Sequence, residues 1–288
     1  MSGVDLRHTA SQIRQTVAGW RVARETIALV PTMGNLHAGH LSLAQLASAH
    51  ADRVILTIFV NPTQFAVGED FESYPRTLAE DRALVEHAGT VDLLFVPKVG
   101  EVYPSGTESA FRLAVPALGG ELCGASRPGH FDGVASVVLR LLNLVAPDLI
   151  VLGRKDYQQL VIIERMIADL RLPIGVIAGE TQRDEDGLAI SSRNDYLTEE
   201  ERKRAPLLHS TLKGLSDRLA SGEHDYAALE KSALAKLEES GFKPEYVEVR
   251  RAGDLGTPNG RQSPGELIVL AAAWLGRARL IDNLCITA

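Results

Sequence analysis

The chain has 288 residues, of which 45% are hydrophobic and 23% are charged, and its formal net charge at pH 7 is -7. This composition is ordinary for one or two soluble globular domains, and it argues against a basic surface that binds nucleic acid. No apolar run reaches the roughly 18 residues of a membrane span, and the polar start lacks the features of a signal peptide. Two cysteines, Cys123 and Cys285, form no disulfide framework, so we expect a reduced, cytoplasmic protein that binds neither membrane nor nucleic acid.

Short β-branched runs alternate with longer helical patterns over the first two-thirds of the chain. Apolar runs without polar alternation are typical of strands buried on both faces. Strand–helix alternation predicts an α/β domain over residues 1–181, with a Rossmann-like, doubly wound parallel sheet and ligand-binding loops at the carboxyl ends of its strands. The predicted strands are residues 27–30, 53–60, 91–96, 148–152 and 174–177, and the predicted helices are 41–50, 78–88, 133–145 and 157–170.

The pattern changes at Gln182, where a polar, glycine-bearing loop begins. Thr198 followed by Glu201 is a capping-box signature, and three acids occupy the first turn of the helix predicted over 198–219. The sequence therefore predicts a smaller α+β domain over residues 182–288. Its other predicted elements are a helix over 226–240 and strands over 246–250, 266–272 and 279–286.

The motif PTMGNLHAGH lies between a predicted strand and a helix. Gly34 lets the backbone approach a ligand closely, and the helix N-terminus attracts an anion. His37 and His40 are placed at that terminus, so both rings can donate to the same phosphate group. Two alternatives remain: the histidines only cap and pack the turn, or they bind zinc, for which no third ligand is evident.

The motif FVNPTQF follows the second predicted strand. Asn61 and Gln64 are neutral polar side chains at the carboxyl end of that strand, where specificity residues are expected, and Phe59 and Phe65 supply apolar walls. The alternative is an ordinary polar turn.

The motif LGRKDYQQL follows a later strand. Gly153 permits close approach, Lys155 can contact phosphate, and Asp156 is a candidate ligand for a phosphate-bound Mg²⁺. Gln159 lies three positions after Asp156, on a similar helix face.

The motif AISSRN lies in the loop where the predicted second domain begins. The hydroxyls of Ser191 and Ser192 and the guanidinium of Arg193 can close over a triphosphate and stabilise charge as pyrophosphate leaves.

Two further stretches, SYPRTLAEDR and SRPGHFDGV, carry polar residues that suit a structural role as well as a functional one. They are Tyr74, Arg76, Asp81, Arg127 and His130. We expect Asp81 to be the best placed of these to support a metal site.

Together these motifs predict a site that binds a nucleoside triphosphate with Mg²⁺. The sequence shows neither a covalent nucleophile motif nor a Walker-type phosphate loop. Attack at the α-phosphate would need only positioning of the reactants and stabilisation of charge. The expected chemistry is adenylyl transfer to an acceptor that the residues alone do not name. A transferase joining AMP to a phosphate monoester and a non-catalytic nucleotide sensor are the competing hypotheses.

The motif set resembles that of the pantothenate synthetase (pantoate–β-alanine ligase) family, within the HxGH nucleotidyltransferases. The resemblance implies two steps: ATP and pantoate form pantoyl adenylate and pyrophosphate, and β-alanine then attacks the adenylate to give pantothenate and AMP. It also implies a cytoplasmic homodimer with a C-terminal lid domain. The matching motifs, in family order, are PTMGNLHAGH, FVNPTQF, GxKDYQQL, SRPGHFDGV and DGLAISSRN.

The resemblance assigns roles residue by residue. It implies that Gln64 binds pantoate and lies near β-alanine, that Gln159 holds pantoate from another side, and that Asp156 lies near Mg²⁺. His40 is the implied proton donor, and the other implied catalytic residues are His37, Lys155, Ser191, Ser192 and Arg193. The implied ATP-binding residues are Met33, Gly34, Asn35, Leu36, His37, Ala38, Gly39, His40, Gly153, Arg154, Lys155, Asp156, Gln182, Ile190, Ser191, Ser192 and Arg193.

Two positions depart from the family pattern. Arg154 stands where members commonly carry Glu, which adds positive charge beside the expected phosphate site. Cys123 stands where some members have Glu, so this chain lacks an acidic group there.

Overall fold

The computed structural model describes residues 3–66, 69, 71–260 and 262–287. The chain divides into two compact units, which are described separately below. The first contains Met1–Arg154 and Ile162–Glu180, and the second contains Lys155–Val161 and Thr181–Ala288. The division therefore passes through one helix, α7 (Tyr157–Asp169), and residues 155–161 group with the second unit although the sequence places them in the first domain.

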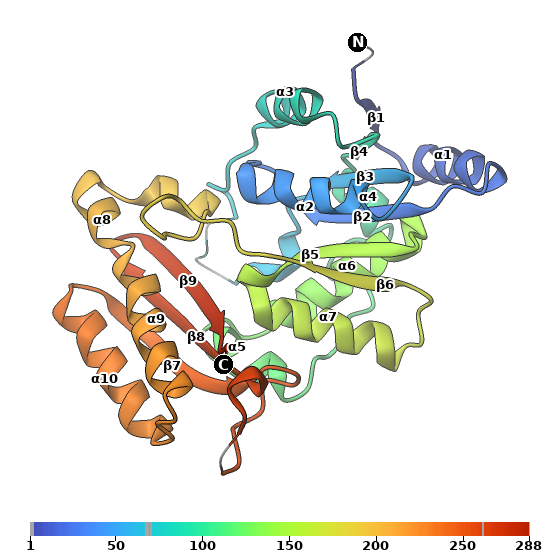
Figure 1. The fold of residues 1–288 in the computed structure, drawn as a ribbon. Helices are drawn as coiled ribbons and strands as arrows, with labels where there is room; N and C mark the ends of the chain where they lie inside the picture. Colours follow the sequence, from blue (N-terminus) through green and yellow to red (C-terminus); the bar gives the residue numbers. More distant parts are fainter. Residues whose placement is uncertain (1–2, 67–68, 70, 261, 288) are drawn as a thin grey trace. The chain divides into compact units, whose positions relative to one another are not determined.

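The first unit contains the predicted parallel sheet, whose strands run in the order β1-β4-β3-β2-β5-β6 (Figure 1). All five predicted strands are confirmed, and β1 is an additional edge strand too short to show a pattern in the sequence. The chain builds outward from β2 to β4, then returns to the other side of β2 for β5, so the topological switch point lies between β2 and β5. The strands are β1 (Asp5–Arg7), β2 (Ile27–Thr32), β3 (Arg53–Ile58), β4 (Leu93–Phe95), β5 (Leu149–Gly153) and β6 (Gly175–Gly179).

The central strands are buried on both faces, as the unbroken apolar runs predict. Ala28 and Val30 of β2 belong to one hydrophobic cluster with Ala44 and Ala47 of α2. Ile27 and Leu29 alternate with them and are also fully buried. Because successive strand side chains point to opposite faces, β2 contributes to the core on both sides.

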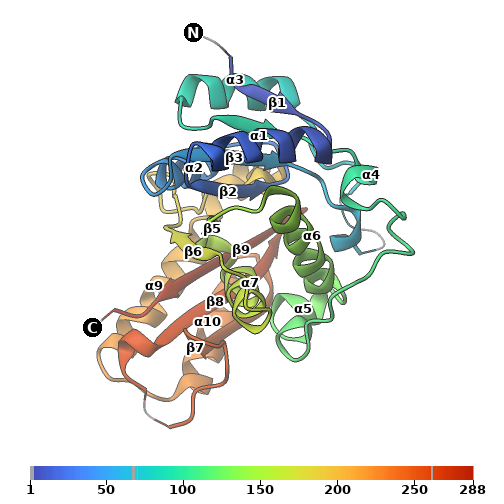
Figure 2. The ribbon, with the colours of Figure 1, turned by 90° about the vertical axis from the view of Figure 1, so that its right-hand side faces the viewer.

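The helices of the first unit surround this sheet (Figure 2). α1 begins at a capping box between Thr9 and Gln12 and buries Ile13 and Val17, a weak amphipathic signal from which no helix was predicted. α1 packs on α6, and α2 packs on β2, β3 and β5. The helices are α1 (Ala10–Val22), α2 (Ala38–Ser48), α3 (Leu78–Ala88), α4 (Val99–Val102), α5 (Cys123–Ser126), α6 (His130–Val145) and the later part of α7, with short 3-10 turns η1 (Pro62–Gln64) and η2 (Leu118–Gly120). A third turn, η3 (Arg154–Asp156), lies where the chain passes from the first unit to the second.

The second unit is a three-stranded antiparallel sheet in the order β7-β8-β9, packed against helices through one apolar core. The α+β expectation is confirmed, with one difference: the helix predicted over 198–219 is two helices, because Pro206 lacks the N–H that a continuous helix needs. The Thr198–Glu201 capping box is present, with bonds of 2.8 and 3.3 Å. The elements are α8 (Glu199–Arg204), α9 (Leu207–Ala220), α10 (Tyr226–Glu239), β7 (Lys243–Arg251), β8 (Leu267–Leu275), β9 (Ala278–Cys285), η4 (Ser192–Tyr196) and η5 (Pro264–Glu266).

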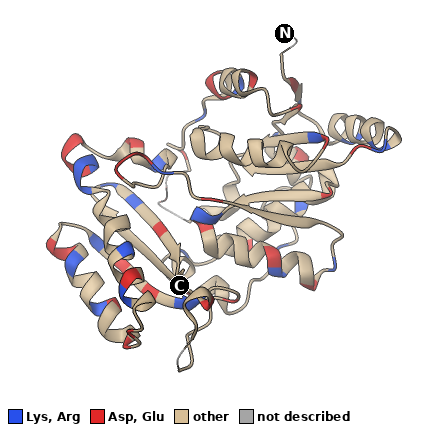
Figure 3. Ribbon diagram, in the orientation of Figure 1, with Lys and Arg blue, Asp and Glu red and all other residues tan. Residues whose placement is uncertain are grey.

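Charged residues of both signs alternate along the outer helices, as on α9 and α10 (Figure 3). Within the part of the chain that the structure describes, no helix combines the length and the apolar character needed to cross a membrane.

Candidate active site

The loop that joins β2 to α2 is held by a buried carboxylate. Asp81 of α3 is 3% exposed, and its two oxygens accept hydrogen bonds from the backbone N–H groups of Asn35, at 3.1 Å, and Leu36, at 2.7 Å. Gly34 adopts a φ of +86°, and a Cβ there would lie 3.1 Å from Asp81 and 3.0 Å from Ile58. Asp81 therefore shapes the loop through its backbone, and glycine is needed where the loop passes over it.

The two histidines form an unusual helix cap. His37 is the N-cap of α2, and its Nδ1 accepts from the backbone N–H of Gly39 at 3.2 Å. The Nδ1 of His40 accepts from the backbone N–H of His37 at 3.3 Å, and the two rings stack with centroids 4.0 Å apart. The arrangement is a capping box in which histidines replace the usual Ser and Glu.

This cap determines which ring nitrogen carries the proton. Because both Nδ1 atoms accept from backbone N–H groups, the proton of each neutral ring is on Nε2. His37 and His40 therefore perform the capping role, which uses Nδ1 of each ring as an acceptor and keeps the Nε2–H group as its donor. Among the described residues, no group of three or more His, Cys, Asp and Glu side chains is arranged to hold a metal ion.

The η1 turn brings Gln64 to the same loop. Gln64 is 9% exposed, and its Nε2 lies 3.2 Å from the sulfur of Met33. The turn itself rests on α6: the ring of His130 bonds the carbonyl of Gln64 at 2.7 Å, and a Cβ on Gly133 would lie 2.3 Å from the carbonyl oxygen of Thr63. The SRPGHFDGV motif therefore supports the FVNPTQF turn, a relation that spacing in the sequence does not reveal.

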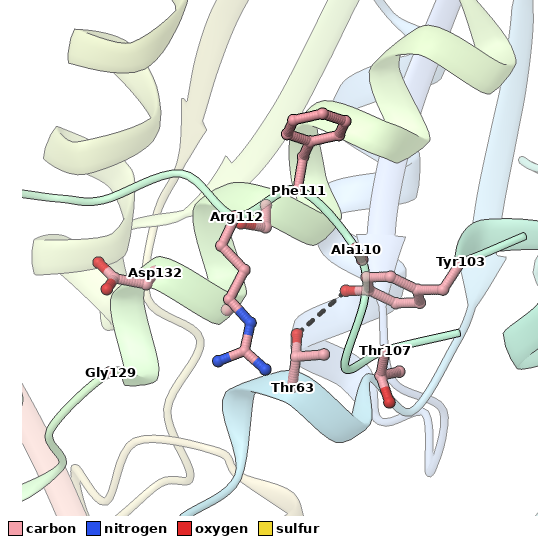
Figure 4. Close-up of a pocket in the computed structure, with 10 residues that line it drawn as sticks. Thr63, Tyr103, Thr107, Ala110, Phe111, Arg112, Gly129 and Asp132 are labelled. Atoms are coloured by element: carbon pink, nitrogen blue, oxygen red, sulfur yellow. Dashed lines mark hydrogen bonds between the residues drawn. The ribbon is translucent and has the colours of Figure 1, made fainter. Parts of the chain in front are cut away.

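An irregular segment after α4 is fastened over the start of α6. Val115 N–H donates to Asp132, Leu113 N–H donates to Ser136, both at 2.8 Å, and Arg140 donates to the carbonyl of Phe111 at 2.6 Å. A small pocket remains beneath this segment, lined among others by Thr63, Tyr103, Arg112, Asp132 and Ser136 (Figure 4).

Glycines end both strands beyond the switch point. Gly153 of β5 is paired with Gly179 of β6, and a Cβ on Gly179 would lie 2.3 Å from the side chain of Leu43 in α2. The next residue, Arg154, forms an ion pair with Glu180 at 3.1 Å. The positive charge of this departure from the family pattern is thus balanced by a carboxylate of its own unit.

In the second unit, Lys155 and Asp156 lie in η3, directly before α7, and form an ion pair at 3.7 Å. The carbonyl of Lys155 accepts from the side chain of Asn283 at 2.9 Å, and the hydroxyl of Tyr157 donates to the carbonyl of Ala252 at 3.2 Å. Gln159 follows on the same helix and is partly buried.

The residues 182–193 form a tight turn with a 3-10 end. Ile190 N–H donates to the carbonyl of Gln182 at 3.0 Å, and Arg183 pairs with Ala189 in an isolated bridge. Ser191 caps η4, because its hydroxyl accepts from the backbone N–H of Arg193 at 3.3 Å. Ser191, Ser192 and Arg193 are thereby placed together at one end of the turn.

A buried ion pair anchors this turn to β9. Arg183 donates to both carboxylate oxygens of Asp282 at 2.7 and 2.8 Å, and His209 Nδ1 lies 3.3 Å from the same group. Burial alone would raise the pKa of Asp282, but the bonds from His209 and Arg183 hold it below its usual value. No motif in the sequence pointed to Arg183 or Asp282, since they are 99 positions apart.

The parallel sheet and its switch point define an α/β protein of the doubly wound class, in which ligands bind at the carboxyl edge of the sheet. A family model described as pantoate-beta-alanine ligase matches residues 5–285. Pantothenate synthetase from Alkalilimnicola ehrlichii is 54% identical over 281 residues, which cover 97% of this chain and 96% of the relative. Pantothenate synthetase from Shewanella amazonensis is 51% identical over 273 residues, which cover 95% of this chain and 96% of the relative.

Solved structures agree with the sequence relatives. Pantothenate synthetase from Thermus thermophilus matches with a TM-score of 0.91 and 41% identity, covering 99% of this chain and all of that chain. A pantoate-beta-alanine ligase from Francisella tularensis, in complex with beta-gamma ATP and beta-alanine, matches with a TM-score of 0.82 and 31% identity over 99% of each chain. The chain belongs to the pantoate–β-alanine ligase family, and it is a ligase that joins these two substrates.

Proposed function

We propose that the ligation depends on ATP and proceeds through pantoyl adenylate. A pantoate carboxylate oxygen attacks the α-phosphorus of ATP, and the bond to pyrophosphate breaks. The amine of β-alanine then attacks the acyl carbon, loses a proton, and expels AMP with the electron pair of the C–O bond. Activation is needed because an amine does not readily attack a free carboxylate. The acyl adenylate is a mixed anhydride, and its leaving group, AMP, departs easily.

The observation that carries this proposal is the double-histidine cap on a loop whose Met33 contacts Gln64. His37 and His40 keep Nε2–H donors at the N-terminus of α2, where an anion is favoured. Gln64 contacts Met33 of the same loop and is a neutral group suited to hydroxyl and carboxylate oxygens. We infer that phosphates are bound at the cap and the acid to be activated at the amide.

Residues of both units are proposed to bind ATP. His40 donates a proton or hydrogen bond in the transition state, and His37 contacts a phosphate. Lys155 contributes positive charge, and the Ser191, Ser192 and Arg193 group stabilises pyrophosphate as it leaves. The further proposed ATP contacts are Met33, Gly34, Asn35, Leu36, Ala38, Gly39, Gly153, Arg154, Asp156, Gln182 and Ile190.

Pantoate is proposed to bind Gln64 and Gln159, with β-alanine also near Gln64. The sulfur of Met33 and the amide of Asn61, which touch the Gln64 side chain, are both uncharged. A phosphorylated acceptor would require cations at this point, so the contacts of Gln64 favour pantoate over a phosphate monoester.

Mg²⁺ is proposed as the metal, near Asp156. This carboxylate is half-exposed and stands beside Lys155, which fits an ion held mostly by phosphate oxygens and water rather than by a protein cage. When bound, Mg²⁺ neutralises phosphate charge, while Lys155 and Arg193 supply the charges that belong to the protein.

We further propose that residues 1–181 and 182–288 are the functional domains, the second acting as a lid, and that two chains form a homodimer in the cytoplasm. The capped turn that carries Ser191 and Arg193 supports the lid assignment. Protection of residues 182–193 from proteolysis by ATP tests the lid, and sedimentation tests the dimer.

Mass spectrometry of the reaction products tests the proposed chemistry. With ATP, Mg²⁺, pantoate and β-alanine, we expect pantothenate, AMP and pyrophosphate in equal amounts, and without β-alanine we expect bound pantoyl adenylate. Formation of ADP and phosphate would indicate an acyl phosphate instead. Pyrophosphate release with a phosphate monoester but not with pantoate would favour the transferase, and intact ATP would favour the sensor.

A further inference from the structure

The buried amide of Asn61 has one orientation that its backbone neighbours allow. Its Oδ1 lies 3.3 Å from the backbone N of Thr63, a donor, and its Nδ2 lies 3.2 Å from the carbonyl O of Gly133, an acceptor. Exchanging O and N would break both bonds in a side chain that is 1% exposed, where unpaired polar groups are costly. Backbone groups therefore set the polarity of this amide.

Gln64 takes its orientation from Asn61. The Nδ2 of Asn61 donates to the Oε1 of Gln64 at 3.0 Å. Because this contact needs an acceptor, the carbonyl end of the Gln64 amide faces Asn61, and its Nε2 end faces the sulfur of Met33. Sulfur is a weak acceptor, so an oxygen of the substrate can take its place.

Tyr103 secures the same amide from another element of the fold. Its hydroxyl donates to the Oδ1 of Asn61 at 2.7 Å and accepts from the hydroxyl of Thr63 at 3.0 Å (Figure 4 shows the Thr63–Tyr103 bond). The hydroxyl oxygen of Thr63 also lies 3.1 Å from the same Oδ1, so the three groups form a triangle. The side chain is 2% exposed, and the guanidinium of Arg140 lies over its ring at 4.7 Å from the centroid. Burial raises the pKa of Tyr103, so the hydroxyl keeps its proton and remains a donor.

We propose that Tyr103 is a positioning residue for pantoate recognition: through Asn61, it holds the Gln64 amide with its N–H donors toward the substrate. In this proposal Tyr103 acts through Asn61 and not by its own contact with pantoate or ATP. The inference rests on the proposed role of Gln64, and it explains why a neutral side chain at this point discriminates in favour of a ligand that presents oxygen acceptors.

The variant Tyr103→Phe keeps the ring and removes only the hydroxyl. We expect the KM for pantoate to rise up to about fivefold, because a less firmly held Gln64 amide weakens one neutral hydrogen bond to pantoate, while the KM for ATP changes less than about twofold. Tyr226→Phe is the matched control, because its hydroxyl bonds the carbonyl of Gly260 in the second unit. An equal rise in both KM values for Tyr103→Phe would overturn the proposal.

Coupling between variants separates positioning from a merely structural role. If Tyr103 acts through the Gln64 amide, adding Tyr103→Phe to Gln64→Ala should raise the KM for pantoate by less than about twofold further. A full fivefold rise in that background would show independent effects and overturn the proposal. If Tyr103→Phe does not fold, Thr63→Val removes another hydroxyl of the triangle. The same results are then expected: a selective rise in the KM for pantoate, and little further rise in the Gln64→Ala background.

Gln64→Ala alone distinguishes failure of the two proposals. If this variant leaves the KM for pantoate unchanged, the assignment of the pantoate site is wrong and the role of Tyr103 falls with it. If Gln64→Ala raises that KM and Tyr103→Phe does not, only the positioning role of Tyr103 is overturned.

Discussion

The β2–α2 junction and the turn over residues 182–193 both carry hydrogen-bond donors proposed to bind phosphate, but different contacts hold the two segments in place. The helix cap of the first depends on near neighbours in sequence, since His37 caps its own helix and His40 closes the cap three residues later, and Asp81 of α3 holds the loop before it. The second depends on Arg183 meeting Asp282, which comes from the last strand. The comparison teaches that local caps, such as those of His37 and Ser191, show in a motif, whereas the distant carboxylates that anchor the two loops, Asp81 and Asp282, do not.

Removing a proposed catalytic ring at the first region should have the largest effect. We expect His40→Ala to lower kcat by about a hundredfold or more while the KM for ATP changes little, since its Nε2–H acts mainly in the transition state. His50→Ala is the matched control, because that exposed ring bonds the carbonyl of Leu46 at the far end of the same helix. Steady-state kinetics decide the point, and an unchanged kcat would remove His40 from the mechanism.

The anchor of the first region is the next most sensitive point. Asp81→Ala should lower the free energy of unfolding by about 3 kcal/mol, because it leaves the buried N–H groups of Asn35 and Leu36 without acceptors. Glu80→Ala, one residue earlier and exposed, should change it by less than about 0.5 kcal/mol. Chemical denaturation of both variants provides the measurement, and equal losses would show that Asp81 has no special role in the loop.

Removing the anchor of the second region should cause a smaller loss of stability and should also weaken ATP binding. Asp282→Asn removes the counter-charge of Arg183, so we expect about 2 kcal/mol of lost stability and a several-fold rise in the KM for ATP. Asp254→Asn breaks an exposed pair with Arg251 in the same unit and serves as control. If the KM for ATP stays constant in Asp282→Asn, the turn does not depend on this ion pair for binding.

Acid should remove the Asp282 contribution in a defined direction. The folded pKa of Asp282 is held below the ordinary Asp value of about 3.9, so the unfolded chain binds the proton first as pH falls. The stabilisation is therefore complete above that value and is lost as pH drops through the folded pKa. Denaturation of the parent and Asp282→Asn from about pH 6 downward should show their stabilities converging in acid, and a gap that widens in acid would contradict this sign.

The smallest effect is expected where the chain departs from its family. Arg154 and Glu180 form a half-exposed ion pair, and Arg154→Glu removes its positive partner. Surface ion pairs contribute about 0 to 1 kcal/mol to the free energy of unfolding. Because its side chain pairs with Glu180, the proposed ATP contact of Arg154 is assigned to its backbone, so we expect a loss of stability of at most about 1 kcal/mol and less than a threefold change in the KM for ATP. Calorimetry and ATP titration test this, and a tenfold change would mean that Arg154 contacts the phosphates directly.

Much of the fold was predictable because its signals are local. The five predicted strands follow from short apolar runs, the helix over 78–88 follows from its helical pattern, and the Thr198–Glu201 box follows from two residues three positions apart. The misses also have physical causes: β1 is only three residues long, α1 has a weakly amphipathic pattern, and Pro206 divides a run that otherwise reads as one helix. The roles of His37, Gln64 and Ser191 remain predictions from the motifs.

The sequence by itself determined the sheet, the order of the motifs and the family, because periodicity, capping and contiguous motifs are written in neighbouring residues. Only the tertiary structure decided what holds those motifs in place. Asp81 reaches back to the β2–α2 loop, Gly133 admits the η1 turn, and Tyr103 meets Asn61 across 42 positions. Such contacts follow from how strands and helices are placed in space. A buried polar residue needs a hydrogen-bond partner, but the sequence does not show which distant residue that partner is.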